Sequence, residues 1–279
     1  MTATPTTAAP PAGAAVAGHQ ARPTLWHLIR SEWTKIWSVR STLWTLGVLI
    51  LVTVGLSTLF NWGESSNLSQ LSPKQRLQLD VTYTAMGGLI LGQLAIAVLG
   101  SMVVTSEYGT GGIRSTFTAA PRRMRVMLSK AIVFGIVAFI TGLIVAFGSY
   151  FLAMIFWSQH GLATNLGQPH VLRAVFGGAL YVLASGMLGF AFGTLLRHTG
   201  AAIATTIGLL FVAPFLTQLL PGTWGDKINT YFIGNAGQHI MQVLHLPGEI
   251  SPWIGYLTMT IWWLVPLAFG AFLVQKRDA

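Results

Sequence analysis

The stretch that decides the fold is AIVFGIVAFITGLIVAFGSYFLAMIFW, residues 131–157, where 27 consecutive positions carry no charged side chain. An α-helix rises 1.5 Å per residue, so about 20 apolar residues cross a hydrocarbon layer about 30 Å thick. The run meets this requirement with residues to spare. It therefore predicts a helix that spans a membrane.

Five more uncharged segments of 20 to 25 residues lie along the chain, and each is long enough to cross a bilayer. They are residues 41–60, 81–105, 174–196, 200–220 and 253–274. Only 8% of the chain is charged and 53% is hydrophobic, whereas a soluble domain carries about 25% charged residues. These features exclude an ordinary soluble enzyme. The fold class we predict is an all-α integral membrane protein with six transmembrane helices in one domain, residues 24–279.

Residues 1–23 consist mostly of Ala, Thr, Pro and Gly. Such a segment cannot bury enough apolar surface to offset the entropy of ordering, so we expect a disordered tail. Arg22 is its first basic residue, and no Leu-rich run of secretory length precedes it. We therefore expect no cleaved signal peptide.

The basic residues fix the expected orientation. The net charge is +9, and placing both termini in the cytoplasm puts 12 of the 16 Lys and Arg residues inside, as the positive-inside rule requires. Basic residues expected inside are Arg22, Arg30, Lys35, Arg40, Arg114, Arg122, Arg123, Arg125, Lys130, Arg197, Lys276 and Arg277. Topology and anionic inner-leaflet lipids thus account for the charge, and we expect no nucleic-acid partner.

Several chemistries find no support in the sequence. The chain has no cysteine and no HExxH motif, so no metal site is predicted. Residues 109–116, GTGGIRST, lack the spacing and the lysine of a phosphate-binding loop, so we expect no bound cofactor and no ATP site in this chain. The six predicted spans contain no Asp, Glu, Lys or Arg, which counts against ion coupling and against an intramembrane enzyme.

An amphipathic helix is predicted before the first span. Residues 24–40, TLWHLIRSEWTKIWSVR, place Leu and Trp at three- and four-residue spacing with polar groups opposite. This pattern suits a helix at the cytoplasmic headgroup boundary, and a plain extension of the first span is the alternative. The residues expected to anchor it are Trp26, Arg30, Trp33, Lys35, Trp37 and Arg40.

The predicted outer segments and the polar residues within spans allow two interpretations each. Ser72, Pro73 and Gln75 predict a helix start with a capping box. In residues 221–252, Ala236, Ile240, Val243 and Leu244 fit one helical face, which favours one or two short helices at the outer interface or a plain loop. Polar residues within spans either line a path or bond to a neighbouring helix. They are Gln93, Ser101, Thr141, Ser149, Tyr150 and Ser185.

The largest predicted inner loop, residues 105–130, TSEYGTGGIRSTFTAAPRRMRVMLSK, is the most informative one. Glu107 ends a helix where the dipole disfavours an acid, so it needs a cation or backbone donor nearby, and Arg114 is within plausible reach. The glycines permit a sharp turn. Residues 113–119 can then form a short helix along the membrane surface, and Pro121 fits the first turn of the next helix. A tight loop anchored by basic residues is the alternative.

At these residues the chain resembles the permeases of type-2 ATP-binding-cassette (ABC-2) transporters, especially the bacterial drug and antibiotic-resistance exporters. The shared pattern is an acid that ends the second span, a Gly-centred turn and a basic stretch with Pro and Lys that opens the third. Gly112 departs from it, because many members have Thr there. The residues that occupy this pattern are Glu107, Gly111, Arg114, Pro121, Arg123 and Lys130. The coupling loop that the resemblance implies also includes Gly112, Arg122 and Arg125.

The resemblance implies a permease subunit in a bacterial cell membrane that exports a hydrophobic or amphipathic substrate. The loop would be a coupling helix that docks into a separate ABC ATPase subunit, and that partner would bind ATP and Mg. The permease would pair with a second permease copy, in a homodimer or a heterodimer. The alternatives are a non-transporting scaffold or sensor that anchors a cytoplasmic partner and, less well supported, a membrane enzyme that acts on lipid.

Overall fold

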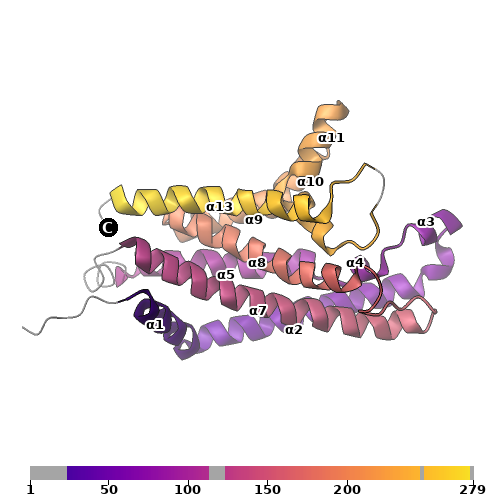
Figure 1. Ribbon diagram of the computed structural model, residues 1–279, viewed down its shortest axis with the longest axis horizontal. Coiled ribbons are helices and arrows are strands. Elements are labelled where there is room, and N and C mark those ends of the chain that lie inside the picture. The colour runs from indigo at the N-terminus through magenta and orange to yellow at the C-terminus, as the bar shows by residue number, and fades with distance from the viewer. Residues whose placement is uncertain (1–23, 113–122, 246–247, 277–279) are drawn as a thin grey trace, which may run out of the picture.

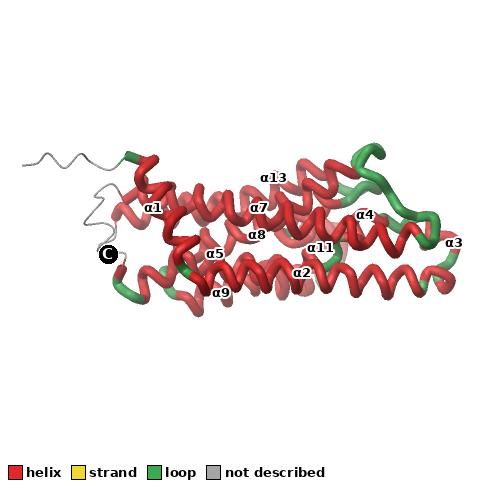
Figure 2. The backbone as a smooth tube through the Cα atoms, turned by 90° about the horizontal axis from the view of Figure 1, so that it is seen from below, coloured by secondary structure: helices red, strands yellow, loops and turns green. Residues whose placement is uncertain are grey.

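The computed structural model describes residues 24–112, 123–245 and 248–276. This part of the chain is helical, and its long helices run side by side along one axis (Figures 1 and 2). Six helical segments in it are long and apolar enough to cross a membrane, in agreement with the prediction. Their bounds are α2 Arg40–Ser66, α5 Leu89–Gly109, α7 Arg123–Ser158, α8 Val171–Leu196, the α9–α10 segment Thr199–Thr217 and α13 Pro252–Lys276.

Shorter helices cap the two ends of the bundle. The helix α1 lies at the end where the described chain begins, and α3 lies at the opposite end (Figure 1). We call these the α1 end and the α3 end. The short elements are α1 Leu25–Ser38, η1 Leu68–Gln70, α3 Pro73–Leu77, α4 Val81–Ala85, α11 Gly222–Tyr231, α12 Ile233–Gln238 and η3 His239–Met241. The predicted capping box of Ser72 and Gln75 is present at the start of α3.

The helix α8 forms the centre of the bundle and packs against α5, α7, α9 and α13. Glycines make the closest of these contacts. A Cβ atom on Gly189 would lie 1.9 Å from the Ala97 carbonyl oxygen, and one on Gly142 would lie 2.7 Å from the Ala179 carbonyl oxygen. Without a hydrophobic driving force between helices in lipid, such close backbone packing is a main source of association. The small residues of the predicted spans thus set the spacing of the core.

The predicted second span, residues 81–105, is wrong in one respect, because the helix is broken. The short helix α4 ends at Ala85 and α5 begins only at Leu89. Two glycines, Gly87 and Gly88, lie between them, and a Cβ on Gly88 would lie 2.4 Å from Ser57 Oγ. A continuous charge-free run fixes the length of a span but does not reveal a break that a neighbouring helix stabilises.

The fifth span also departs from the predicted regular helix over residues 200–220. It begins at Thr199, widens into a π-helical turn at Gly208–Val212 and ends at Thr217. Pro214 lies two positions after Val212, where the widened turn ends. Because proline has no N–H and its ring clashes with the carbonyl four residues earlier, regular α-helical bonding cannot continue through this point.

Two other helix boundaries differ from the sequence prediction. The first and third spans are longer than the uncharged runs, since α2 continues to Ser66 and α7 already begins at Arg123. Charged and polar residues therefore extend these helices beyond their apolar parts. The helix α1 does not continue into α2, because Val39 between them adopts an extended conformation. This bend lets α1 fold back against α7.

Residues 221–252 contain the two short helices α11 and α12, as one of the two interpretations predicted. The helix α11 projects from the side of the bundle (Figure 1). In contrast, α12 packs against α13, and its Ala236 and the following Ile240 are fully buried. Leu244, predicted on the same face, is 38% exposed because the chain becomes extended at Gln242. The predicted helical face therefore ends before Val243.

Candidate functional site

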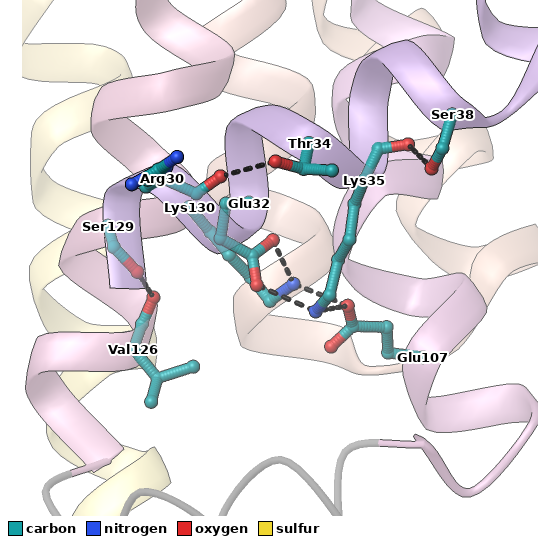
Figure 3. Close-up of polar contacts among 9 residues, drawn as sticks. All are labelled: Arg30, Glu32, Thr34, Lys35, Ser38, Glu107, Val126, Ser129 and Lys130. Carbon is teal, nitrogen blue, oxygen red and sulfur yellow. Dashed lines mark hydrogen bonds and ion pairs between the residues drawn. The ribbon is translucent and has the colours of Figure 1, made fainter. Parts of the chain in front are cut away.

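Four charged side chains from three helices meet at the α1 end. Lys130 donates hydrogen bonds to Glu32 Oε2 at 2.7 Å and to Glu107 Oε1, and Lys35 donates to Glu32 Oε1 at 2.7 Å and to Glu107 Oε1 at 3.2 Å (Figure 3). We call Glu32, Lys35, Glu107 and Lys130 the four-charge cluster. It connects α1 to both α5 and α7.

The cluster is balanced in charge but unequally exposed. The side chain of Lys130 is 2% exposed and that of Glu32 is 10% exposed, whereas that of Lys35 is 44% exposed. Partial burial lowers the pKa of Lys35, but the hydrogen bond and charge of Glu32, together with Glu107, outweigh burial and raise its pKa above the ordinary value. Breaking a buried ion pair costs about 3–5 kcal/mol because the remaining charge lacks compensation. Lys130 is therefore the member whose loss would disturb the cluster most.

Helix geometry explains how the four side chains meet. Glu32 and Lys35 are three residues apart on α1, so they lie on the same face. Glu107 lies in the last turn of α5, where the helix dipole disfavours an acid and nearby lysines offset this cost. Lys130 lies on α7, which enters the bundle beside α1. The cluster thus joins the two helices that flank residues 110–122 to the same face of α1.

The structure describes six of the nine loop residues that were singled out in the sequence. Glu107 and Lys130 belong to the four-charge cluster. Arg123 donates to the Val274 carbonyl oxygen at 3.3 Å, and Arg125 is exposed. The chain turns at Gly111, whose φ is +71°, in the region that favours glycine.

Gly112 is only partly exposed, and the rest of the predicted loop lies outside the described residues. This applies to Arg114, Pro121 and Arg122 and to the surface helix predicted for residues 113–119. The expected pairing of Glu107 with Arg114 therefore stays a prediction. The cations that the described part of the chain places at Glu107 are Lys35 and Lys130.

The predicted anchor residues of α1 divide into two groups. Trp26 and Trp37 are 69% and 53% exposed, and Arg30 and Arg40 are exposed as well. Trp33 is half-buried beside Trp37, with ring centroids 5.9 Å apart, while Lys35 joins the four-charge cluster. Sequence reasoning missed Glu32. An acid three residues before a lysine in an otherwise basic helix was the available signal.

A second polar group surrounds the break between α4 and α5. Asn61 on α2 donates to the carbonyl oxygens of Thr84 and Ala85 at 3.1 and 3.3 Å, and Trp157 donates to Asn61 Oδ1 at 2.7 Å. Ser57 accepts from the Gly88 amide at 3.0 Å. Because a span needs partners for every backbone polar group, these side chains make the break possible within an apolar environment.

At the α3 end two charged side chains hold backbone groups instead of each other. Asp80 Oδ2 accepts from the amides of Val243 and Leu244 at 2.6 and 2.9 Å. Arg173 donates to the carbonyl oxygens of Ile240 and Gln242 at 3.2 and 2.6 Å. We call these contacts the Asp80–Arg173 clamp. The clamp fixes residues 240–244 to α4 and α8.

Several polar residues of the spans form bonds within the bundle. Gln93 accepts from Tyr181 at 2.7 Å and from Ser185 at 3.3 Å, and Ser101 donates to the Gly189 carbonyl oxygen at 3.1 Å. These contacts agree with the interpretation that such groups bond to neighbouring helices. Within the described ranges no three His, Asp or Glu residues gather as potential metal ligands.

Comparison with known proteins gives a family match. A family model described as ABC-2 family transporter protein matches residues 28–214, well over half of the chain. The match covers α2 through α9 and includes all four residues of the four-charge cluster. No curated protein matches the chain.

Proposed function

Because the chain belongs to the ABC-2 transporter family, in which it is a multi-pass membrane permease, we propose that it is the permease subunit of an exporter of the bacterial drug and antibiotic-resistance kind. It moves a hydrophobic or amphipathic substrate out of the cell with the energy of ATP hydrolysis. A separate ABC ATPase subunit binds and hydrolyses ATP with Mg, and a second permease copy completes the transporter. The protein lies in the plasma membrane with both termini in the cytoplasm.

The observation that carries this proposal is the four-charge cluster. Residues 110–122 connect α5 to α7, and the cluster joins both helices to α1 just beside this connection. If an ATPase pushes on residues 110–122, the ends of α5 and α7 cannot move without either moving α1 or breaking buried ion pairs. Since separating such pairs is costly, α1 moves with them.

The motion then reaches the spans through the bend at Val39, because α1 leads there into α2. The ATPase cycle would bias the bundle between two arrangements, and this bias is a coupling free energy between the nucleotide site and the substrate path. In this account residues 113–119 are the docking element. Arg114, Arg122 and Arg125 provide its basic surroundings, and Pro121 lies two positions before Arg123, the first described residue of α7.

The distribution of charge supports the orientation. The α1 end carries the basic residues of α1 and of the start of α7, whereas Lys74 and Arg76 lie on α3 at the opposite end. Under the positive-inside rule the richer end faces the cytoplasm. The exposed Trp26 and Trp37 suit the headgroup region of the inner leaflet, where α1 would lie as an interfacial helix.

The experiment is to extract the tagged full-length chain in mild detergent and to identify co-purifying proteins by mass spectrometry. We expect an ATPase with a GxxxxGK[ST] loop, and we expect substrate to stimulate ATP hydrolysis by the recovered complex. An intact, monodisperse protein without such a partner would contradict the proposal and favour the scaffold or the enzyme.

Loop variants test the coupling step in the same complex. Arg114→Ala removes none of the four side chains of the cluster but takes a basic residue from the proposed docking element, so we expect less substrate-stimulated hydrolysis with normal membrane insertion. The control is Lys74→Ala, which removes an exposed cation at the α3 end. Equal stimulation in the two variants would contradict the role assigned to the loop.

A further inference from the structure

A groove on the outside of the bundle runs from the four-charge cluster along α2 and α5. One part, of about 470 Å³, is lined at one end by Glu32, Lys35, Glu107 and Lys130 and continues between apolar side chains to Thr45 and Ala95. The next part, of about 460 Å³, starts at the same two residues and continues to Thr53 and Gly92. The two parts form one groove with a charged end and an apolar end. We call it the α2–α5 groove.

The dimensions and lining suit an elongated amphipathic molecule. On α5 the lining extends from Glu107 to Leu91, which is about 24 Å along the helix at 1.5 Å per residue. Each part lies within the range of about 300–1,000 Å³ that is typical of small-molecule sites. Trp44, Val48 and Val52 along the groove are 75%, 56% and 46% exposed, so the groove is open along its length.

Two polar atoms along the groove lack the partners that buried groups normally have. Glu107 Oε2 accepts no hydrogen bond from any described residue, although it is buried. Thr53, which is 1% exposed, has an Oγ1 atom equally without a partner in the described chain. The unpaired carboxylate oxygen at the charged end points to a ligand with a hydrogen-bond donor at its head.

The four charged side chains of the cluster indicate which charge the head group of the ligand carries. Lys130 is buried and bonded to both acids, so it stays in place. Lys35 is 44% exposed, lines the groove and reaches Glu107 over the longer distance of 3.2 Å. A ligand ammonium could take the place of Lys35 beside Glu107 without leaving a carboxylate unpaired. A ligand anion would pair with Lys35 instead and would leave Glu107 Oε2 without a donor.

We propose that the α2–α5 groove binds an elongated amphipathic cation, with its ammonium group at Glu107 in competition with Lys35 and its apolar body between α2 and α5. This inference rests on the proposed function, since it names the substrate class of the exporter and the place where that substrate enters from the membrane. It assigns Glu107 a binding role besides its part in the four-charge cluster. It assigns Lys35 the role of a built-in competitor.

The test uses the full-length chain in nanodiscs of neutral phosphatidylcholine, without the ATPase. The probe is dodecylamine with a photoreactive diazirine in its alkyl chain, and the matched control probe carries a sulfate head. Labelled positions are mapped by mass spectrometry at increasing probe concentration. We expect saturable labelling of α2 and α5 by the amine, and the sulfate probe should not label the groove saturably.

Three variants make the result specific. Glu107→Gln should raise the half-saturating amine concentration by about tenfold, the effect of one charge-assisted hydrogen bond. Lys35→Met should lower it several-fold, which a merely structural role for Lys35 would not do. Ala95→Phe, at the junction of the two parts, should abolish groove labelling with the cluster intact. Ile140→Phe, at an exposed position on α7 away from the groove, is its control.

Equal labelling of all variants, or equal labelling by both probes, would overturn the inference. So would unchanged amine binding in Ala95→Phe together with a change in oligomeric state, since the groove would then be covered by a second copy of the chain. These outcomes are separable from failure of the proposed function. The labelling needs no ATPase, whereas co-purification of an ATPase with the full-length chain needs no ligand in the groove.

Discussion

The two ends of the bundle use charged side chains in opposite ways. At the α1 end the four-charge cluster pairs side chains with side chains, so three helices depend on one another through ions. At the α3 end the Asp80–Arg173 clamp pairs each charge with backbone amides or carbonyls of residues 240–244. Removing a charge therefore leaves a buried ion unpaired at the first end but only neutral groups unpaired at the second.

The two arrangements of charge suit different mechanical roles. The cluster joins whole helices that flank the proposed ATPase-docking loop, so it is suited to transmit motion. The clamp holds a short connecting segment against α4 and α8, so it is suited to keep one end of the bundle in a fixed arrangement. Charge pairs between side chains can exchange partners, as Lys35 and a ligand would, whereas backbone groups stay attached to their segment.

The largest effect is expected for Lys130→Met. The substitution leaves Glu32 and Glu107 with only the half-exposed Lys35, and loss of one partner from a buried pair costs about 3–5 kcal/mol. Thermal unfolding in detergent should show this loss. The chain has no cysteine, so Leu28→Cys provides a single labelling site on α1 whose reaction rate should rise as α1 detaches.

A double variant sharpens this prediction. Removing Glu107 as well, in Lys130→Met with Glu107→Gln, takes away one of the carboxylates left unpaired. The two substitutions should therefore cost less together than the sum of the single variants. Strict additivity would mean that the cluster is not one interacting unit.

An intermediate effect is expected for Asp80→Ala at the other end. The amides of the half-buried Val243 and the exposed Leu244 lose their acceptor, so the cost should not exceed the roughly 1–3 kcal/mol of an unsatisfied buried group. Hydrogen exchange at these two amides should accelerate, while the labelling of Leu28→Cys stays unchanged. Asp80→Asn keeps one side-chain acceptor and should lose less. Faster exchange at the α1 end would contradict the independence of the two ends.

The smallest effect is expected for the exposed member of the cluster. The raised pKa of Lys35 means that its contribution to stability is complete below the ordinary value of 10.5 and declines as pH rises through the higher value of the folded protein. The difference in unfolding temperature between the original chain and Lys35→Met should thus be constant from pH 7 to about pH 10 and shrink above it. High salt should reduce it at every pH, because the side chain is half-exposed. A difference that grows with pH would contradict this assignment.

Much of the fold could be predicted because the length of an uncharged run shows directly whether a helix can cross the bilayer. The run at residues 131–157 lies entirely within α7, and most of every other predicted span is helical. The breaks were not predictable in this way. Gly87 and Gly88 interrupt a helix only because Ser57 and Asn61 supply partners for free backbone groups 31 and 23 positions later in the chain.

The candidate site was predictable only in part. Glu107 and Lys130 were identified from the loop pattern, and Lys35 was identified as an anchor of α1. Glu32 was missed, because its role depends on α1 folding back against α7, and the bend at Val39 that permits this has no clear sequence signal. The ion pairs Lys35–Glu107 and Glu32–Lys130 join residues 72 and 98 positions apart, and the local periodicity of a sequence cannot predict such pairs.

The most direct test of the central claim is substrate-stimulated ATP hydrolysis by the complete transporter in proteoliposomes, compared between Lys130→Met and the control Lys74→Met. If the four-charge cluster transmits motion from the ATPase to the spans, Lys130→Met should keep its basal hydrolysis and its bound ATPase but lose most of the stimulation, whereas Lys74→Met should behave like the original chain. Full stimulation in Lys130→Met, with α1 shown by labelling to be detached, would contradict the account.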